Sequence, residues 1–306
     1  MKKTIITICA IFSCSYNYAC DICGGGLGSN YLGLLPDFNN KFVGIRYHHN
    51  QLRTQLDING NITSLSNLEK YNTMDMWGAW NIAEKWRVMA ILPYSKISKF
   101  NYGSEINVNK SGVGDINLMG FYNLLNKNSV INDNRLTQSL WLGLGVKFGS
   151  GKYQAQENQN NDSPNIFQLG TGSTDYQIQA NYDIRLQNTG ISWSGNYKIN
   201  TENSDNYKYG NKLMTAINLY HKFSAGLNNR ITPTIGMVYE HQQRDHHLKY
   251  ELDQTGGKGI NAVVGVEANF KKLAIGLSMQ KPIHQDLNMG RTIMKHKISS
   301  HITYTL

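Results

Sequence analysis

The chain has 306 residues, of which 40% are apolar and 10% aromatic, and a formal net charge of +9. No run beyond residue 20 is apolar enough to cross a membrane as a helix, and the basic residues are scattered rather than clustered, so the composition indicates neither a helical membrane protein nor a nucleic-acid-binding protein. Membrane-spanning β-strands are compatible with this composition, because half of each such strand is polar.

Residues 1–19 have the pattern of a secretory signal peptide. Two lysines precede an apolar run over 5–12, and small and polar residues continue to Ala19, after which we place the cleavage site. A lipoprotein signal ending at Cys14 is the alternative, whereas a retained anchor is disfavoured because the apolar run is too short to span a bilayer. Removal of this segment lowers the net charge from +9 to +7, because it holds two lysines and no acid.

Residues 20–40 are rich in Gly and lack periodicity, which predicts a periplasmic lead-in or a short plug. They contain a CxxC motif, Cys20 and Cys23, followed by Gly24 where covalent haem attachment would require a histidine. A disulfide or a simple thiol pair is the ordinary interpretation. Binding of a soft metal such as Cu(I) is the sharper alternative, because two thiolates can flank one ion while leaving its other positions unfilled. No other cofactor is indicated.

From Lys41 onward, extended segments alternate apolar and polar residues with a period of two. We predict about twelve strands, which make residues 41–306 one closed antiparallel transmembrane β-barrel in an all-β fold. A secreted soluble β-sandwich or solenoid is the competing fold; it predicts more irregular strand lengths, and the sequence has no fixed repeat that would support a solenoid. The strands are expected at 41–55, 68–82, 86–102, 111–126, 134–149, 172–187, 189–201, 207–224, 228–245, 257–270, 273–285 and 291–306.

The clearest alternation lies in one predicted hairpin, residues 175–200. Its first strand places one set of side chains toward lipid, Tyr176, Ile178, Ala180, Tyr182, Ile184 and Leu186. The second strand continues this face with Ile191, Trp193, Gly195, Tyr197 and Ile199. The residues between them are polar, so a barrel would direct them into its lumen.

Short and long connections alternate along the chain, as they do in outer-membrane barrels with short periplasmic turns and long external loops. An even number of strands then places both termini in the periplasm. Pro93 and Pro233 each remove a ladder donor, so we expect bulges there. Aromatic residues near strand ends are expected in the interfacial girdles, namely Trp80, Trp86, Tyr94, Trp141, Tyr182, Trp193, Tyr239 and Tyr304.

The period of two also directs charges of both signs toward the lumen. They either pair to hold a filled interior or line a narrow polar pathway, and the sequence leaves both alternatives open. These candidate pore-lining residues are Arg87, Asp115, Lys147, Asp175, Asp183, Arg185, Lys198, Glu240 and Glu267.

Two further kinds of site were weighed. His241, His246 and His247 cluster at an external loop, where they are solvated side chains or, alternatively, capture a transition metal. A surface lipid hydrolase would need a serine beside a histidine, and the nearest pairings are His221 with Ser224 and His296 with Ser300. Neither pairing has an adjacent orienting Asn in the pattern expected of outer-membrane phospholipase A.

Three segments carry a resemblance to a known family: CDICGGGLGSNYLGLLPDFNNKFVGIRY, MWGAWNIAEKWRVMAILPYSKI and SGVGDINLMGFYNLL. They resemble a family of Gram-negative outer-membrane barrels generically labelled as transporters and, more distantly, barrels of the phenol meta-pathway type. A further Cys is expected soon after the CxxC in that family, whereas this chain has Gly24, Gly25 and Gly26. The resemblance implies an outer-membrane barrel for passage of a small solute, and it supplies no catalytic residue.

The sequence therefore predicts a monomeric outer-membrane channel or transporter for a small polar or amphipathic solute. Its expected partners are the assembly machinery for barrels, outer-membrane lipid and lipopolysaccharide, with no nucleic acid. A non-conducting barrel with a blocked lumen and a surface lipid hydrolase are the alternatives.

Overall fold

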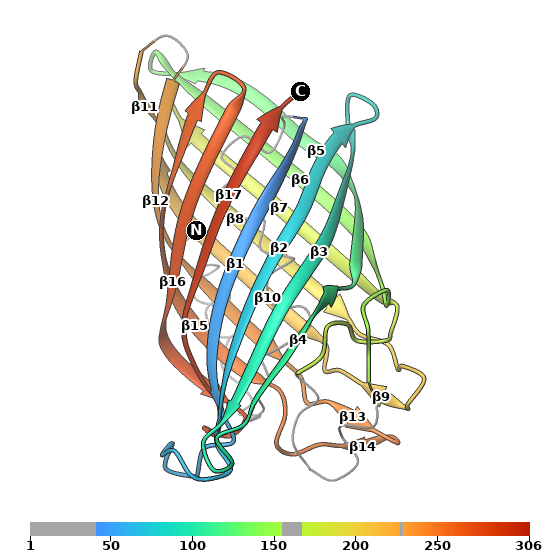
Figure 1. Ribbon diagram of the computed structural model, residues 1–306. Coiled ribbons are helices and arrows are strands. Elements are labelled where there is room, and N and C mark those ends of the chain that lie inside the picture. Colours follow the sequence, from blue (N-terminus) through green and yellow to red (C-terminus); the bar gives the residue numbers. More distant parts are fainter. Residues whose placement is uncertain (1–40, 155–166, 227–228) are drawn as a thin grey trace, which may run out of the picture.

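The computed structural model describes residues 41–154, 167–226 and 229–306 (Figure 1). The predicted signal peptide, the lead-in and both CxxC cysteines lie outside these residues. The described residues form an all-β fold. Among them, no helix has the length and apolar character needed to cross a membrane.

Twelve strands stand side by side around a barrel. They are β1 (Phe42–Thr54), β2 (Asn67–Asn81), β3 (Trp86–Asn101), β5 (Ile116–Ile131), β6 (Asn134–Phe148), β7 (Asp175–Leu186), β8 (Thr189–Ile199), β10 (Lys212–His221), β12 (Asn229–Gln242), β15 (Gly257–Phe270), β16 (Leu273–Leu287) and β17 (Ile293–Thr305). Two short strands, β4 (Asn107–Val113) and β11 (Phe223–Ser224), continue the lines of β5 and β10. A separate small sheet holds β9 (Tyr207–Lys208), β13 (His246–His247) and β14 (Tyr250–Glu251).

The barrel closes where the first strand meets the last. β1 pairs antiparallel with β17 from Phe42 opposite Thr305 to Arg53 opposite Ile293, and each neighbouring pair around the barrel is also antiparallel. Closure leaves no sheet edge in the lipid, where an unpaired backbone group costs several kcal/mol. The predicted closed antiparallel barrel of about twelve strands is confirmed.

The two faces of the wall differ in the way that the alternation predicts. In the hairpin of β7 and β8, Tyr176 and Ile178 are 53% and 52% exposed on the outer face, whereas Asp175 and Gln177 are 0% and 1% exposed on the inner face. Trp193 on β8 also lies on the outer face. The wall therefore presents apolar side chains outward and encloses polar ones.

The two ends of the barrel also differ. One end, which we call the turn end, carries the C-terminus and the short connections such as Asn132–Asp133 and Lys271–Lys272, and it is uppermost in Figure 1. The opposite loop end carries the long connections, including 55–66, 149–174 and 243–256. Location of the turn end in the periplasm remains a prediction.

Several predicted boundaries need correction. β5 continues to Ile131, so the connection expected at 127–133 shrinks to the two residues Asn132 and Asp133, whose positive φ angles of 47° and 60° suit a tight hairpin turn. The strand expected at 207–224 is divided into β9, β10 and β11. Trp141 is 3% exposed and packs inside the barrel, so its assignment to an interfacial girdle is wrong.

Pro93 and Pro233 coincide with interruptions of the neighbouring strand instead of bulges in their own strands. Ile91 pairs with Asn117 and Tyr94 with Val113, so two residues of β3, Leu92 and Pro93, face the three residues 114–116. Opposite Pro233, the partner line is broken between β10 and β11. Because proline lacks an N–H, the break falls on the strand that would have received its hydrogen bond.

The outward face can be tested by placing a charge in the lipid. Met76 on β2 is 63% exposed and lies about midway between the outward residues Trp80 and Lys70. Met76→Arg should lower the free energy of unfolding in phospholipid vesicles by about 2–4 kcal/mol, whereas Met76→Leu should change it little. Equal free energies for the two variants would contradict the assignment of this face to lipid.

Candidate functional site

Eight of the nine charged residues predicted to line the lumen lie on inward-facing positions of their strands, and the ninth, Asp115, lies between β4 and β5. Seven of them are buried, with exposed fractions of 0% to 7%: Arg87, Asp115, Lys147, Asp175, Lys198, Glu240 and Glu267. Asp183 and Arg185 are half-buried nearer the turn end, and Asp183 accepts a hydrogen bond of 2.8 Å from the Tyr220 hydroxyl. The lumen is therefore a site of concentrated charge.

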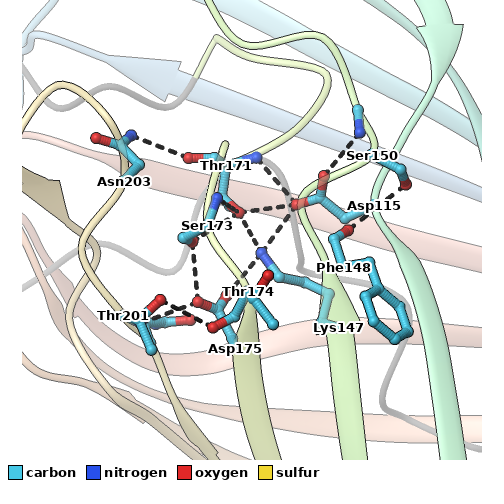
Figure 2. A network of polar contacts seen from close by, with 12 residues as sticks. Asp115, Lys147, Phe148, Ser150, Thr171, Ser173, Thr174, Asp175, Thr201 and Asn203 are labelled. Carbon is cyan, nitrogen blue, oxygen red and sulfur yellow. Dashed lines mark hydrogen bonds and ion pairs between the residues drawn. The ribbon is translucent and has the colours of Figure 1, made fainter.

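The first polar network centres on Lys147, which lies opposite Asp175 in the register of β6 and β7 (Figure 2). Its Nζ is 2.8 Å from Asp115 Oδ2 and 2.6 Å from Asp175 Oδ2. Ser173 donates a hydrogen bond of 2.9 Å to Asp175. All four side chains are buried, and the Lys147 ammonium is shared between the two carboxylates inside the wall of the barrel.

The same network fixes the two described ends of one connection, 149–154 and 167–174, at the inner wall. The sequence suggested that 150–171 is an external loop, but Asp115 accepts hydrogen bonds from the backbone N–H groups of Gly151 at 3.0 Å and Thr171 at 2.9 Å. Gly170 is required here, because a Cβ on it would lie 2.5 Å from Asp115 Oδ1 and 2.6 Å from the Gly151 carbonyl carbon. The glycines at 149, 151, 170 and 172 were the available signal for this close approach.

Two apolar side chains of this connection narrow the loop end of the lumen. Phe167 and Leu169 are buried in a cluster with wall residues of five strands or their ends, Leu52, Tyr71, Ile97, Leu287 and Met294. Lys110 of β4 donates a hydrogen bond of 2.9 Å to the Phe167 carbonyl oxygen. The described ends of this connection therefore form an inward constriction, which sequence reasoning missed.

A second charged group lies on β1 and β2 and was also missed. Arg46 donates to Asp75 Oδ2 through Nε at 3.0 Å and through a terminal nitrogen at 2.7 Å, and His48 Nε2 lies 3.2 Å from the same oxygen. The Arg46 guanidinium also covers the Trp77 ring at 4.7 Å. These three polar residues occupy alternate inward positions, so the period of two could have identified them.

Other lumen charges are paired across the wall. Lys212 of β10 lies 2.9 Å from Glu240 of β12, and His301 of β17 lies 3.3 Å from Glu267 of β15. Part of the predicted charge set is thus held in pairs, as expected for a structured lumen.

An apolar wall shares the lumen with these charges. Its members line the inner face of β1 to β6, and they are Phe42, Trp77, Ala79, Met89, Ile91, Met119, Phe121 and Trp141. A smaller apolar group, Met214, Ala216, Val238 and Val263, lies on β10, β12 and β15. The lumen is therefore amphipathic.

Some lumen side chains have unused hydrogen-bonding capacity. The amides of Asn50 and Asn261 and the hydroxyls of Thr232 and Thr234 are buried and have no hydrogen-bond partner among the described residues. Buried polar groups of folded proteins are normally satisfied by protein or by water. These positions therefore offer donors and acceptors to water or to a polar solute inside the barrel.

The predicted histidine site is spread over two elements. His246 and His247 form β13 in the small sheet, whereas His241 lies on β12, where it pairs with Lys258. No group of three or more His, Cys, Asp or Glu side chains suitable for a metal ion occurs within residues 41–154, 167–226 and 229–306. The serine–histidine pairings show no mutual hydrogen bond in this part of the chain, and His221 Nδ1 instead lies 2.8 Å from Thr189 Oγ1.

Comparison with known proteins identifies the family. The model of a family described as "Putative MetA-pathway of phenol degradation" matches residues 48–281. The chain belongs to this family. The resemblance that the sequence carried to barrels of the phenol meta-pathway type is thereby confirmed.

Solved structures confirm the fold. An outer membrane channel from Pseudomonas putida F1 is 12% identical, with a TM-score of 0.63 over 87% of this chain and 96% of that chain. The β domain of the Bordetella autotransporter BrkA is 10% identical, with a TM-score of 0.50 over 87% of this chain and 100% of that one. No curated protein matches the chain. The protein has the fold of an outer-membrane β-barrel.

At the loop end, Asp245 holds two connections together outside the membrane-spanning strands. It is 0% exposed and accepts hydrogen bonds from the Gly210 N–H at 2.7 Å and the Tyr207 hydroxyl at 2.5 Å. Burial raises the pKa of the Asp245 carboxyl above its usual value. Its contribution to stability is consequently greatest at low pH and is lost as the pH rises through the folded pKa.

The direction in which Asp245 changes stability with pH can be measured at the Gly210 amide, which donates a hydrogen bond to it. At each pH, the hydrogen-exchange rate of this amide in the unmodified protein is divided by its rate in the Asp245→Asn variant. The quotient should rise from acid to neutral pH, because the buried carboxyl becomes charged and destabilises the contact, whereas the amide of the variant does not titrate. The same ratio for Asp253→Asn, whose side chain is 77% exposed, should stay constant. A ratio for Asp245→Asn that is constant or falls with pH would contradict the expectation.

Proposed function

We propose that the protein is an outer-membrane channel for a small amphipathic solute, with its turn end in the periplasm. The observation that carries this proposal is the lumen itself, in which polar side chains with unused hydrogen-bonding capacity face an apolar wall. A solute with one polar and one apolar part can use both surfaces. A purely structural barrel would gain nothing from the unused polar groups of Asn50 and Asn261, which cost free energy when they are left unsatisfied.

The solute class that fits best is a single aromatic ring with a hydroxyl or carboxylate substituent. Trp77, Phe121 and Trp141 make the apolar wall aromatic, and Met89 and Met119 add polarizable sulfur, a composition that is compatible with an aromatic solute. The amides and hydroxyls of the lumen, at Asn50, Asn261, Thr232 and Thr234, offer hydrogen bonds to the substituent. The family description, which refers to phenol degradation, agrees with this chemistry.

The described ends of 149–174 are proposed to set the width of the pathway. Asp115 anchors both ends, and Phe167 and Leu169 occupy lumen space beside Leu52 and Ile97. A solute entering from the loop end meets this constriction before it reaches the aromatic wall. The channel is accordingly narrow.

The function is tested with folded protein in proteoliposomes and planar bilayers. We expect discrete conductance steps and faster vesicle swelling with 4-hydroxybenzoate than with a sugar of similar size, because only the former suits an amphipathic lumen. Swelling without this preference would overturn the solute class. The absence of both conductance and swelling would overturn the channel and leave a barrel with a blocked lumen.

Weakening the anchor of the constriction should widen the pathway. Asp115→Asn removes the charge that accepts hydrogen bonds from Thr171 and pairs with Lys147, which should weaken attachment of the connection by about 1.5–3 kcal/mol. Single-channel conductance should therefore increase. Glu267→Gln is the matched control, since it also removes a lumen carboxylate without touching the connection. Equal conductance changes in both variants would assign the effect to charge alone.

A further inference from the structure

The height of the apolar band can be estimated from the residues on the outward face of β2 and β3. Trp80 and Trp86 lie near the turn end and are 44% and 52% exposed. Lys70 and Lys96 lie ten positions away on the same two strands and are also exposed. Ten residues of a strand tilted by about 40° rise about 25 Å, which is the height of the apolar band of outer-membrane barrels. Each lysine therefore stands at the loop-end edge of this band.

The register gathers further basic residues at this level. His49, Asn72 and Lys96 form one row across β1, β2 and β3, and the His49 and His296 rings are 5.9 Å apart. On β17, Lys295 and His296 lie between the buried residues Met294 and Lys297 at a register shift, which places both of them on the outer side. Arg53 continues the outward positions of β1. We call Arg53, Lys70, Lys96 and Lys295 the basic patch.

The four strands that carry the basic patch have no outward-facing carboxylate. β1, β2, β3 and β17 together contain only two carboxylates, Glu69 and Asp75, and these are 2% and 1% exposed on the inward face. No ion pair joins Lys70, Lys96 or Lys295 to a carboxylate among the described residues. Four positive charges thus project from one side of the barrel, just beyond its apolar surface. Such an arrangement suits an amphiphile that is anionic at its head and apolar in its tails.

We propose that the basic patch binds the diphosphorylated disaccharide headgroup of a lipopolysaccharide molecule in the outer leaflet. Outer-membrane barrels expose their long loops outside the cell, so the loop-end edge of the band meets the outer leaflet. The patch spans the four strands β17, β1, β2 and β3, or about 14 Å at the usual strand spacing. That width exceeds what a single phosphodiester requires and matches a headgroup with two phosphates. Lipid A is therefore favoured over a phospholipid.

The acyl tails have a suitable surface beneath the patch. On the outer face of β1 and β2, toward the turn end from the basic patch, Ile45, Met74 and Met76 are 51%, 51% and 63% exposed. Tyr94 on β3 is 53% exposed. Lysine ammonium groups bind phosphate as compact point charges, while the apolar band contacts the tails. The proposal concerns the outer wall only and does not depend on what passes through the lumen.

The proposal is tested by native mass spectrometry of the full-length protein in detergent, with purified diphosphoryl lipid A, monophosphoryl lipid A and phosphatidylglycerol as probes. We expect diphosphoryl lipid A to bind most tightly. The Lys70→Gln, Lys96→Gln double variant should bind it about thirtyfold more weakly, which corresponds to about 1 kcal/mol for each lysine. The control is Lys271→Gln, Lys272→Gln, which removes two exposed lysines at the turn end and should leave the affinity unchanged.

Heat-modifiable migration on gels verifies that each variant is a folded barrel, and the single variants Lys70→Gln and Lys96→Gln provide the same comparison if the double variant does not assemble. Unchanged lipid A affinity in the folded patch variants would overturn the proposal. An equal loss in the turn-end control would do so as well, because the binding would then be a general charge effect. Phosphatidylglycerol binding as tight as that of diphosphoryl lipid A would overturn the assignment to lipopolysaccharide.

Discussion

The seam between β1 and β17 is the pairing on which the rest of the structure depends. Without it, the N–H and C=O groups of two edge strands would face hydrocarbon, where neither water nor another strand can satisfy them. The seam runs from Phe42 opposite Thr305 to Arg53 opposite Ile293, the length of the wall. Closure in turn assigns every second residue of each strand to an enclosed lumen.

Enclosure explains why the lumen charges occur in compensated groups. Asp75 pairs with Arg46, and Lys147 lies between Asp115 and Asp175, since a buried charge without a partner is costly. Replacement of buried ion pairs by apolar residues is often neutral or stabilising, so pairing alone does not explain why the charges are there. Retention of charges beside the aromatic wall of Phe121 and Trp141 is consistent with a lumen that must be polar on one side.

Much of the wall could be predicted from the sequence, because one face contacts lipid and the other does not. Residues 257–270 were predicted as a strand with the bounds that β15 has, since their alternation is regular. Apolar and polar residues alternate poorly along β1 and β2. Their outward side chains near His49 and Lys70 lie beyond the apolar band, so both faces of these strands are polar there. Trp141 was wrongly assigned to the interfacial girdle because tryptophan is common there, although the period of two places this residue on the inner face of its strand. The placement of 149–154 and 167–174 depends on contacts with Asp115 and Leu52, which lie far away in the chain; the glycines at these ends were a signal of close approach but did not identify those partners.

The constriction follows from one irregularity in β3. Pro93 has no N–H to offer, and three residues of the neighbouring strand occupy the space opposite two, so Gly114 donates to the Pro93 carbonyl oxygen at 2.9 Å and the ladder resumes at Ile91. The extra residue releases Asp115 from the regular ladder. Its carboxylate can then accept hydrogen bonds from the backbone of Gly151 and Thr171 while it pairs with Lys147. The missing N–H of Pro93 is thus accompanied by a carboxylate, Asp115, that attaches both described ends of the connection to the inner wall.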